Sequence, residues 1–292
     1  MRSLSFKQVD VFTNVRFMGN PVAVVLEGEG LSGIQMQRIA NWTNLSETTF
    51  VLPATEAGAD YRLRIFTPNA ELPFAGHPTI GTAHALIESG AVQPKDGVLV
   101  QQCAAGLVRL EVSAEAGGER WIAFDLPAAR FTSLSADHVG ELEMILGASL
   151  EREPPPKIVD VGPRWLTVQL ESAEAVLALQ PDMARMKAHD LRIGITGIVV
   201  FGEYPAGHCA RIEVRAFVPA HGIDEDPVCG SGNGAVGAFI RDSGQVHHFG
   251  SDFIAAEGVV VGRAGVVRLS VSPGRIRVAG KAVTCIEGSL RV

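Results

Sequence analysis

The feature of this 292-residue sequence that most restricts its fold is an internal duplication. The segment Gly76–Val92 (GHPTIGTAHALIESGAV) aligns without gaps with Gly230–Val246 (GSGNGAVGAFIRDSGQV), and both end in Ser-Gly-x-Val. The flanking sequence repeats as well, in the pairs Arg64–Pro68 with Arg215–Pro219 and Gly106–Val112 with Gly265–Val271. The repeat predicts two halves, each with a strand, a Pro-rich turn, a Gly-rich helix start, a helix and a strand pair.

The pattern of apolar residues fills in the other elements of each half. A helix is expected from Ser32, its N-cap, to about Trp42, and one long apolar helix per half is expected at Thr79–Ile87 and Ala235–Ile240. Strands are expected in the first half at residues 6–12, 21–26, 47–52 and 61–67. Elements similar to these strands and to the helix from Ser32 are expected in the second half at 157–161, 164–170, 182–189 and 198–201. The three consecutive prolines in Leu150–Pro156 indicate a spacer.

These elements predict an α+β fold of two pseudo-equivalent halves. In each half a curved mixed sheet or barrel is expected to surround a central helix. The boundary is placed between residues 118 and 119, giving halves of 1–118 and 119–292, and the last strand, about residues 280–292, is a candidate to return to the first half. Two equivalent halves usually hold a shared site in the cleft between them, so attention falls on the equivalent helix starts.

Charge and cysteine usage exclude several classes of partner. A net charge of −7 without any run of Lys or Arg argues against nucleic acid and anionic membranes, which leaves a small molecule as the expected partner. The four cysteines are far apart and form no C-x-x-C, so neither a metal site nor a disulfide framework is expected. Since the sequence also shows neither a signal peptide nor about 18 uninterrupted apolar residues, a cytoplasmic protein is expected.

Two loops place small residues at the start of a helix, Phe74-Ala-Gly-His-Pro78 and Asp226-Pro-Val-Cys-Gly-Ser-Gly-Asn-Gly234. Backbone N–H groups and the positive end of the helix dipole make such a start a binding site for a carboxylate or phosphate. A single loop of this kind is explained by a turn alone, whereas its repetition at duplicate positions favours a site. Neither loop matches a P-loop or a dinucleotide-binding motif, so no cofactor is predicted.

Glu47 is the candidate acid/base. It lies in Asn44-Leu-Ser-Glu-Thr-Thr-Phe50 at the start of an apolar strand, whereas the corresponding segment of the second half, Gly194–Val199, contains no carboxylate. One unpaired acid in a duplicated scaffold indicates a single-base site, which suits the movement of a proton along one face of a substrate. A carboxyl whose pKa is raised by a dry environment would serve this purpose.

Three further polar residues lie at the two helix starts. His77 and Asp226 are able to orient a substrate or take part in proton transfer, and each is equally explained as a cap or a turn residue. Cys229 directly precedes Gly230 at a helix start, a position expected to lower the pKa of a thiol. Its counterpart in the first half is Ala75, so no symmetric pair of thiols is expected.

The motifs GNPVAVV, MQRIANWTNLSETTFVLP, RIFTPNAELPFAGHPTIGTA and DEDPVCGSGNG together resemble the phenazine-biosynthesis PhzF-like family. The resemblance extends from Phe6 to about Gly288 and implies the diaminopimelate epimerase-like fold, commonly as a homodimer. It also implies a cofactor-independent isomerase acting on a compound such as dihydro-hydroxyanthranilic acid, with Glu47 moving a proton between ring carbons. Cys229 departs from the family pattern, in which Thr is usual, and this leaves the substrate open.

The resulting candidate residues are Glu47, His77 and Asp226 for catalysis, and Ser46, Gly76, Cys229, Gly230 and Ser231 for binding a small carboxylate. Two alternatives stay open at this point. The first is a racemase or epimerase of amino or hydroxy acids that uses Glu47 and Cys229 as opposed bases. The second is a binding protein without turnover.

Overall fold

The computed structural model describes residues 2–115, 119–150 and 153–292. It divides into two compact units, here called unit 1 (residues up to Asp125, together with Ala279–Val292) and unit 2 (Leu126–Val278). The boundary expected from the sequence falls on residue 118, outside the described residues, and the chain leaves unit 1 after the strand that ends at Asp125. Of the spacer Leu150–Pro156, residues 151 and 152 are also outside the description, and the others form no helix or strand.

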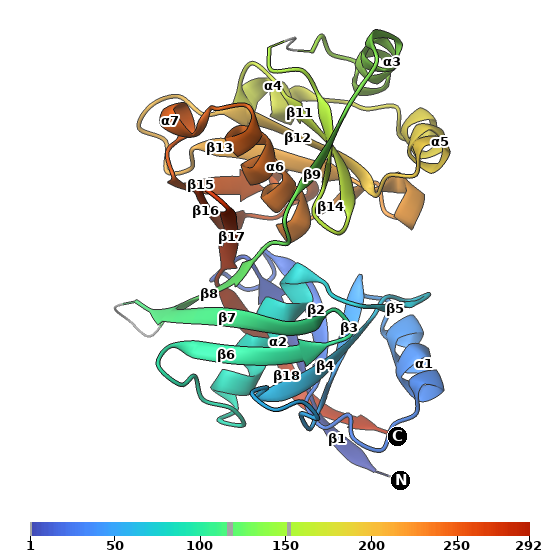
Figure 1. Ribbon diagram of the computed structural model, residues 1–292. Coiled ribbons are helices and arrows are strands. Elements are labelled where there is room, and N and C mark those ends of the chain that lie inside the picture. Colours follow the sequence, from blue (N-terminus) through green and yellow to red (C-terminus); the bar gives the residue numbers. More distant parts are fainter. Residues whose placement is uncertain (1, 116–118, 151–152) are drawn as a thin grey trace. The chain divides into compact units, whose positions relative to one another are not determined.

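Unit 1 is a mixed sheet with one buried helix. Its elements are β1 (Ser3–Val11), β2 (Asn20–Val25), α1 (Gly33–Thr43), β3 (Glu47–Leu52), β4 (Tyr61–Phe66), β5 (Glu71–Leu72), α2 (Gly76–Glu88), β6 (Val98–Cys103), β7 (Gly106–Ala114), β8 (Arg120–Asp125) and β18 (Ala282–Arg291) (Figure 1). Strand β1 pairs antiparallel with both β18 and β2, and β2 runs parallel to β3. Strand β4 is antiparallel to β3 and parallel to β6, which continues into the antiparallel strands β7 and β8.

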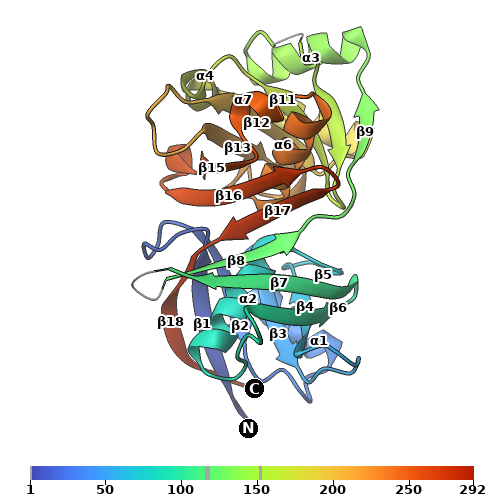
Figure 2. The ribbon, with the colours of Figure 1, turned by 60° about the vertical axis from the view of Figure 1, so that its left-hand side comes forward.

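Helix α2 is the core of unit 1. Nearly every residue from His77 to Ile87 is buried, and the helix packs against β1, β2, β3, β8 and β18 (Figure 2). Gly81 permits this close approach, because a Cβ there would lie 2.4 Å from Cγ1 of Val22 and 2.9 Å from Cγ2 of Val11. An apolar helix that is buried all round explains why the sequence shows no polar face in this segment.

Unit 2 repeats this order of pairing. Its elements are β9 (Arg130–Ser133), α3 (Ala136–Leu146), β10 (Lys157–Asp160), β11 (Arg164–Gln169), α4 (Ala173–Ala178), α5 (Met183–Ile193), β12 (Gly197–Glu203), β13 (Ile212–Phe217), η1 (Pro219–His221), β14 (Glu225–Asp226), α6 (Gly230–Asp242), α7 (Val246–Phe249), β15 (Asp252–Glu257), η2 (Val259–Val261), β16 (Gly265–Ser272) and β17 (Arg275–Gly280), which crosses the boundary. Strand β10 is antiparallel to β9 and β11, β11 is parallel to β12, β12 is antiparallel to β13, and β13 is parallel to β15. The pairing therefore confirms the duplication predicted from the sequence.

The helices of the two units correspond, and for the two long apolar helices the sequence predicts this correspondence. Helices α2 and α6 both have 13 residues and begin at the aligned Gly76 and Gly230. Helices α1 and α5 both have 11 residues and end in a left-handed residue, Asn44 or Gly194. Ser32 is the N-cap of α1, as expected, with a complete capping box.

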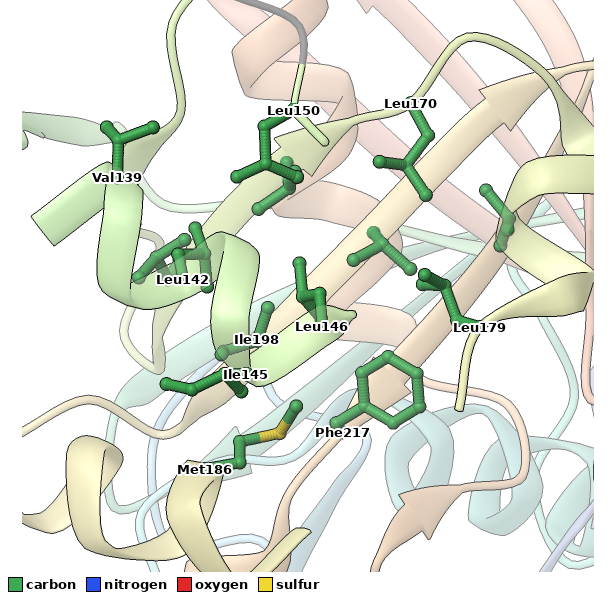
Figure 3. Close-up of a cluster of buried hydrophobic side chains, with 14 of the residues drawn as sticks. Val139, Leu142, Ile145, Leu146, Leu150, Leu170, Leu179, Met186, Ile198 and Phe217 are labelled. Atoms are coloured by element: carbon green, nitrogen blue, oxygen red, sulfur yellow. The ribbon is translucent and has the colours of Figure 1, made fainter. Parts of the chain in front are cut away.

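Unit 2 adds three α-helices, α3, α4 and the short α7, that have no counterpart among the described residues of unit 1. Helix α3 packs with α5 against the sheet in an apolar cluster, in which Ile145, Leu146, Met186 and Ile198 are buried (Figure 3). This second layer increases the apolar area that unit 2 removes from water. None of the helices among the described residues is long and apolar enough to cross a membrane.

One ion pair is present in both units but differs in burial. Arg64 donates Nε and Nη2 to the carboxylate of Glu71 at 2.7 Å each, and Arg215 donates the same two groups to Glu225 at 3.0 and 2.8 Å. The side chains of the first pair are 23% and 38% exposed, and those of the second only 4% and 5%. Helix α4 accounts for part of this difference, because Arg215 also donates to the carbonyl oxygens of Val176 and of the following Leu179.

Candidate active site

Glu47 and His77 come together inside unit 1. Glu47 is the first residue of β3, and His77 is the second residue of α2. Oε2 of Glu47 lies 3.2 Å from Nε2 of His77, and the two side chains are 15% and 8% exposed. The sequence places the two residues 30 positions apart, so it is the packing of β3 on α2 that forms the pair.

Threonines fix β3 in this position. Oγ1 of Thr49 donates to the carbonyl oxygen of Ala23 at 3.2 Å and lies 2.9 Å from Oγ1 of Thr82 in α2. Oγ1 of Thr48 lies 2.8 Å from Oγ1 of Thr43, at the end of α1. The strand that begins at Glu47 is thus hydrogen-bonded to α2, to β2 and to the end of α1.

Burial raises the pKa of the Glu47 carboxyl to about 7, and the neighbouring Ser46 side chain opposes this rise. Desolvation disfavours the charged form, which is the usual cause of such a rise in a buried carboxyl. Near neutral pH the group is therefore present both as an acid and as a base. This is the protonation behaviour that proton transfer requires.

The start of α2 is tightly packed around Gly76. A Cβ at this position would lie 2.7 Å from Cζ of Phe124, so a larger residue would displace the phenyl ring. Ala75 is the N-cap and makes no side-chain hydrogen bond, and Pro78 has no N–H to satisfy. Ser46 and Gly76 are chain neighbours of Glu47 and His77, so four of the predicted site residues lie together in unit 1.

The other four predicted residues form one turn in unit 2. Asp226 ends β14 and accepts a hydrogen bond from the N–H of Val228 at 3.1 Å. Cys229 is the N-cap of α6, and its Sγ accepts from the N–H of Gly232 at 3.3 Å. Oγ of Ser231 accepts from Nε1 of Trp165 at 3.1 Å.

The prediction that the helix start lowers the pKa of the Cys229 thiol is wrong. Burial raises the pKa of the Cys229 thiol well above its usual value, and the carboxyls of Asp226 and Glu257 raise it further. The helix start does not reverse this, because the side chain is fully enclosed and two acidic groups face it. Cys229 is thus held as a thiol, which does not act as a base.

The comparison with known proteins covers nearly the whole chain. Residues 9–288 match the family model PhzC-PhzF, described as phenazine biosynthesis-like protein. The chain belongs to the phenazine biosynthesis-like family. A crystal structure of the Bacillus anthracis phenazine biosynthesis protein of the PhzF family is 26% identical, with a TM-score of 0.86 over 100% of both chains. The fold implied by the sequence resemblance is thereby confirmed.

Two curated relatives illustrate the family. Antisense-enhancing sequence 1 of Schizosaccharomyces pombe is 43% identical over 99% of both chains. The trans-2,3-dihydro-3-hydroxyanthranilate isomerase of Pseudomonas fluorescens is 36% identical over 97% of both chains. The chain is an isomerase of this PhzF-like family.

The unit 2 counterpart of Glu47 in this PhzF-like chain is Gly197. Glu47 lies opposite Val22 at the start of β3, and Gly197 lies opposite Trp165 at the start of β12, in the same parallel strand pair of each unit. A Cβ on Gly197 would lie only 2.1 Å from the carbonyl oxygen of Phe217. Unit 2 therefore lacks this carboxyl and also has no room for any side chain in its place.

Sequence reasoning missed three residues that surround the turn in unit 2, namely Trp165, Asn233 and Glu257. Only Asn233 lies in a motif, the Gly-rich helix start, and the other two come from strands distant in sequence. Among the described residues no group of three or more His, Cys, Asp or Glu is arranged to hold a metal ion.

Proposed function

We propose that this chain is an acid/base isomerase that moves a proton between two carbons of a small cyclic carboxylate, with Glu47 as the group that carries the proton. The observation that supports this most strongly is the Glu47 carboxyl itself. It is buried, has a pKa raised to about 7 and lies 3.2 Å from His77. Its counterpart Gly197 bears no side chain, so unit 2 offers no second carboxyl at the equivalent position.

The reaction proceeds in two proton transfers. The Glu47 carboxylate removes a proton from one ring carbon, and the electron pair of the broken C–H bond forms a new double bond as the existing double bond shifts. The resulting carboxylic acid of Glu47 then returns a proton to another ring carbon on the same face. Atoms and electrons balance within the substrate and Glu47, and His77 keeps the carboxyl oriented between the two steps.

The turn in unit 2 is proposed to bind the carboxylate of the substrate. The positive end of α6 and the N–H groups of Gly230 and Ser231 are suited to an anion. Asp226, two residues before Val228, is proposed to hold a polar group of the substrate. In this proposal Cys229 contributes its place in the turn and not its chemistry, because its thiol stays protonated.

The compound named for the Pseudomonas fluorescens relative, trans-2,3-dihydro-3-hydroxyanthranilate, is the first substrate to test, since this chain is 36% identical to that isomerase. The proposal also includes a reaction without a cofactor and a cytoplasmic homodimer. Retention of activity after exhaustive dialysis against a chelator, and a dimer mass by light scattering, are the expected results.

Proton NMR in D2O tests the proposal with this compound and a panel of cyclic amino and hydroxy acids. We expect conversion of one compound with deuterium uptake at the carbon that receives the proton. In the Glu47→Gln variant the rate should fall by about 100-fold or more, the usual contribution of general acid/base catalysis. Glu71→Gln is the matched control, because Glu71 is a half-exposed carboxylate of the same unit.

Two results would overturn the proposal. Full turnover by Glu47→Gln would remove Glu47 from the reaction. Binding of the compounds without conversion or exchange would indicate the binding protein that was the second alternative from the sequence.

A further inference from the structure

The backbone N–H groups around the start of α6 are almost all used within the protein. The N–H of Val228 donates to Asp226, that of Gly232 to Sγ of Cys229, and that of Asn233 to the carbonyl oxygen of Cys229. The N–H of Cys229 donates to Oε2 of Glu257 at 3.0 Å. Only Gly230 and Ser231 have N–H groups that donate to no acceptor among the residues that the structure describes.

Glu257 and Asn233 hold the residue that comes just before these two donors. Oε2 of Glu257 accepts from the N–H of Cys229 and also from Nδ2 of Asn233, at 2.6 Å. Nδ2 of Asn233 donates in addition to the carbonyl oxygen of Cys229, at 2.9 Å. Both polar groups of the Cys229 backbone are thus fixed by two side chains that are themselves 1% and 0% exposed.

The strand behind Glu257 is rigidly placed. Glu257 is the last residue of β15, where it lies opposite Val214 of β13 and Gly265 of β16. The turn presses closely on this end of the strand: a Cβ on Gly258 would lie 2.3 Å from the carbonyl oxygen of Pro227, and one on Gly265 would lie 2.4 Å from Val228. The Glu257 carboxyl is therefore held in a fixed position.

Unit 1 has no such carboxyl. The equivalent of Glu257 is Cys103, the last residue of β6, which donates to the carbonyl oxygen of Gly106 instead of to the helix start. The equivalent of Asn233 is Thr79, which accepts a hydrogen bond from Gln101. Among the described residues, the carboxyl and amide pair thus occurs at the helix start of unit 2 and not at the equivalent helix start of unit 1.

We propose that Glu257 and Asn233 are positioning residues that hold the Cys229 backbone so that the N–H groups of Gly230 and Ser231 point together at the carboxylate of the substrate. This inference rests on the proposed function for the identity of the ligand, and on the hydrogen bonds alone for the ordering of the turn. An isolated anion-binding helix start would need no such support. Here the neighbouring glycines, Gly230 and Gly232, leave the backbone free to adopt other conformations unless side chains fix it.

The experiment compares Glu257→Ala, Glu257→Gln and Asn233→Ala with the unaltered protein. Glu213→Ala is the matched control, because Glu213 is a carboxyl of the same sheet that is also 1% exposed, but bonds Tyr204 instead of α6. Glutamine keeps an oxygen acceptor at the same place, so Glu257→Gln should restore the function that alanine removes. Asn233→Ala serves as the second variant should Glu257→Ala not fold.

The first readout needs no ligand. Amide hydrogen exchange should accelerate by about tenfold or more at Cys229 in Glu257→Ala and Asn233→Ala, because the buried hydrogen bond that protects this amide is removed or loosened. The Glu257→Gln and Glu213→Ala proteins should keep slow exchange at the Cys229 amide. Unchanged exchange in Glu257→Ala and Asn233→Ala, or equal acceleration in the Glu213→Ala control, would overturn the inference.

The second readout is the Michaelis constant for trans-2,3-dihydro-3-hydroxyanthranilate, with the dissociation constant of its aromatic analogue 3-hydroxyanthranilate as a binding measurement. Glu257→Ala should raise both about tenfold and change kcat by less than about threefold, the pattern of lost substrate binding. An equal loss in Glu213→Ala would indicate a merely structural role. If the unaltered protein neither converts nor binds these compounds, the proposed function fails while the exchange measurement still decides the positioning role.

Discussion

Oε2 of Glu47 lies 3.2 Å from Nε2 of His77, in a site that leaves only 15% of the glutamate side chain exposed. A carboxyl held this way has a pKa of about 7, against 4.5 for its ordinary value. The folded protein therefore binds more protons at Glu47 than the unfolded chain does between these two pH values. The stability that comes from the neutral carboxyl is complete below about pH 4.5 and is lost as the pH rises through about 7.

This sign gives a prediction for Glu47→Gln, in which the side chain stays neutral at every pH. Between pH 4 and pH 8, the unfolding free energy of the unaltered protein should fall by up to about 3 kcal/mol more than that of the variant. Urea unfolding at the two pH values measures this difference, and the contribution of Glu213, whose pKa is also raised to about 7, cancels because both proteins contain it. An equal pH dependence in both proteins would show that Glu47 is not the titrating group.

Cys229 should be chemically inert and dispensable for proton transfer. Burial and two nearby carboxyls keep its thiol protonated, whereas Cys209 is exposed. Alkylation with iodoacetamide at pH 8 should modify Cys209 at least about tenfold faster than Cys229, because the thiolate is the reacting species. Peptide mass spectrometry over a time course measures both rates, and Cys229→Ala should keep kcat within about tenfold of the unaltered protein. A fall in kcat as large as that expected for Glu47→Gln would instead support a racemase that uses Glu47 and Cys229 as two opposed bases.

The duplicated ion pair offers a comparison of one interaction in two environments. Arg215→Met should lower the unfolding free energy by about 3–5 kcal/mol, because it leaves the carboxylate of Glu225 buried without its partner. Arg64→Met should cost about 1 kcal/mol or less, since its partner Glu71 stays accessible to water. Urea unfolding of both variants tests this, and equal costs would contradict the assignment of the difference to burial.

Gly197 should tolerate no side chain. In Gly197→Ala the new Cβ would lie 2.1 Å from the carbonyl oxygen of Phe217, so β12 and β13 would have to separate, and we expect a loss of about 2–4 kcal/mol. Gly140→Ala is the control, because nothing lies within 4 Å of a Cβ in the middle of α3, and alanine should stabilise that helix by up to about 1 kcal/mol. Thermal unfolding of the two variants should therefore shift in opposite directions.

The repeat made much of the fold predictable from the sequence. The aligned glycines at 76 and 230 locate the starts of α2 and α6, and Asn44 and Gly194 end the equivalent helices α1 and α5. A pattern present twice predicts an element from two independent stretches of sequence, which strengthens the expectation. Helices α3 and α4 occur once and have no counterpart in unit 1, so the repeat gave no indication of them.

The site was predictable only where its chemistry is local. Glu47 was identified as the candidate acid/base because its motif lies at a strand start and the corresponding segment of the second half contains no carboxylate. The raised pKa of Cys229 was not predictable, because it depends on burial and on Glu257, which is 28 residues away in sequence. For the same reason the sequence did not indicate that Glu257 and Asn233 hold the turn, since contacts between a strand end and a helix start follow from packing.

The two units also differ in the order in which their strands become available. Strand β18, which pairs along β1 in unit 1, follows all of unit 2 in the sequence. During synthesis from the N-terminus, unit 2 can complete its own sheet while β1 still presents an unpaired edge. An edge of this kind is prone to pair with other chains until its partner arrives. Unit 1 is therefore the first of the two equivalent units to emerge from the ribosome and the last to be completed. It is also the unit that carries Glu47.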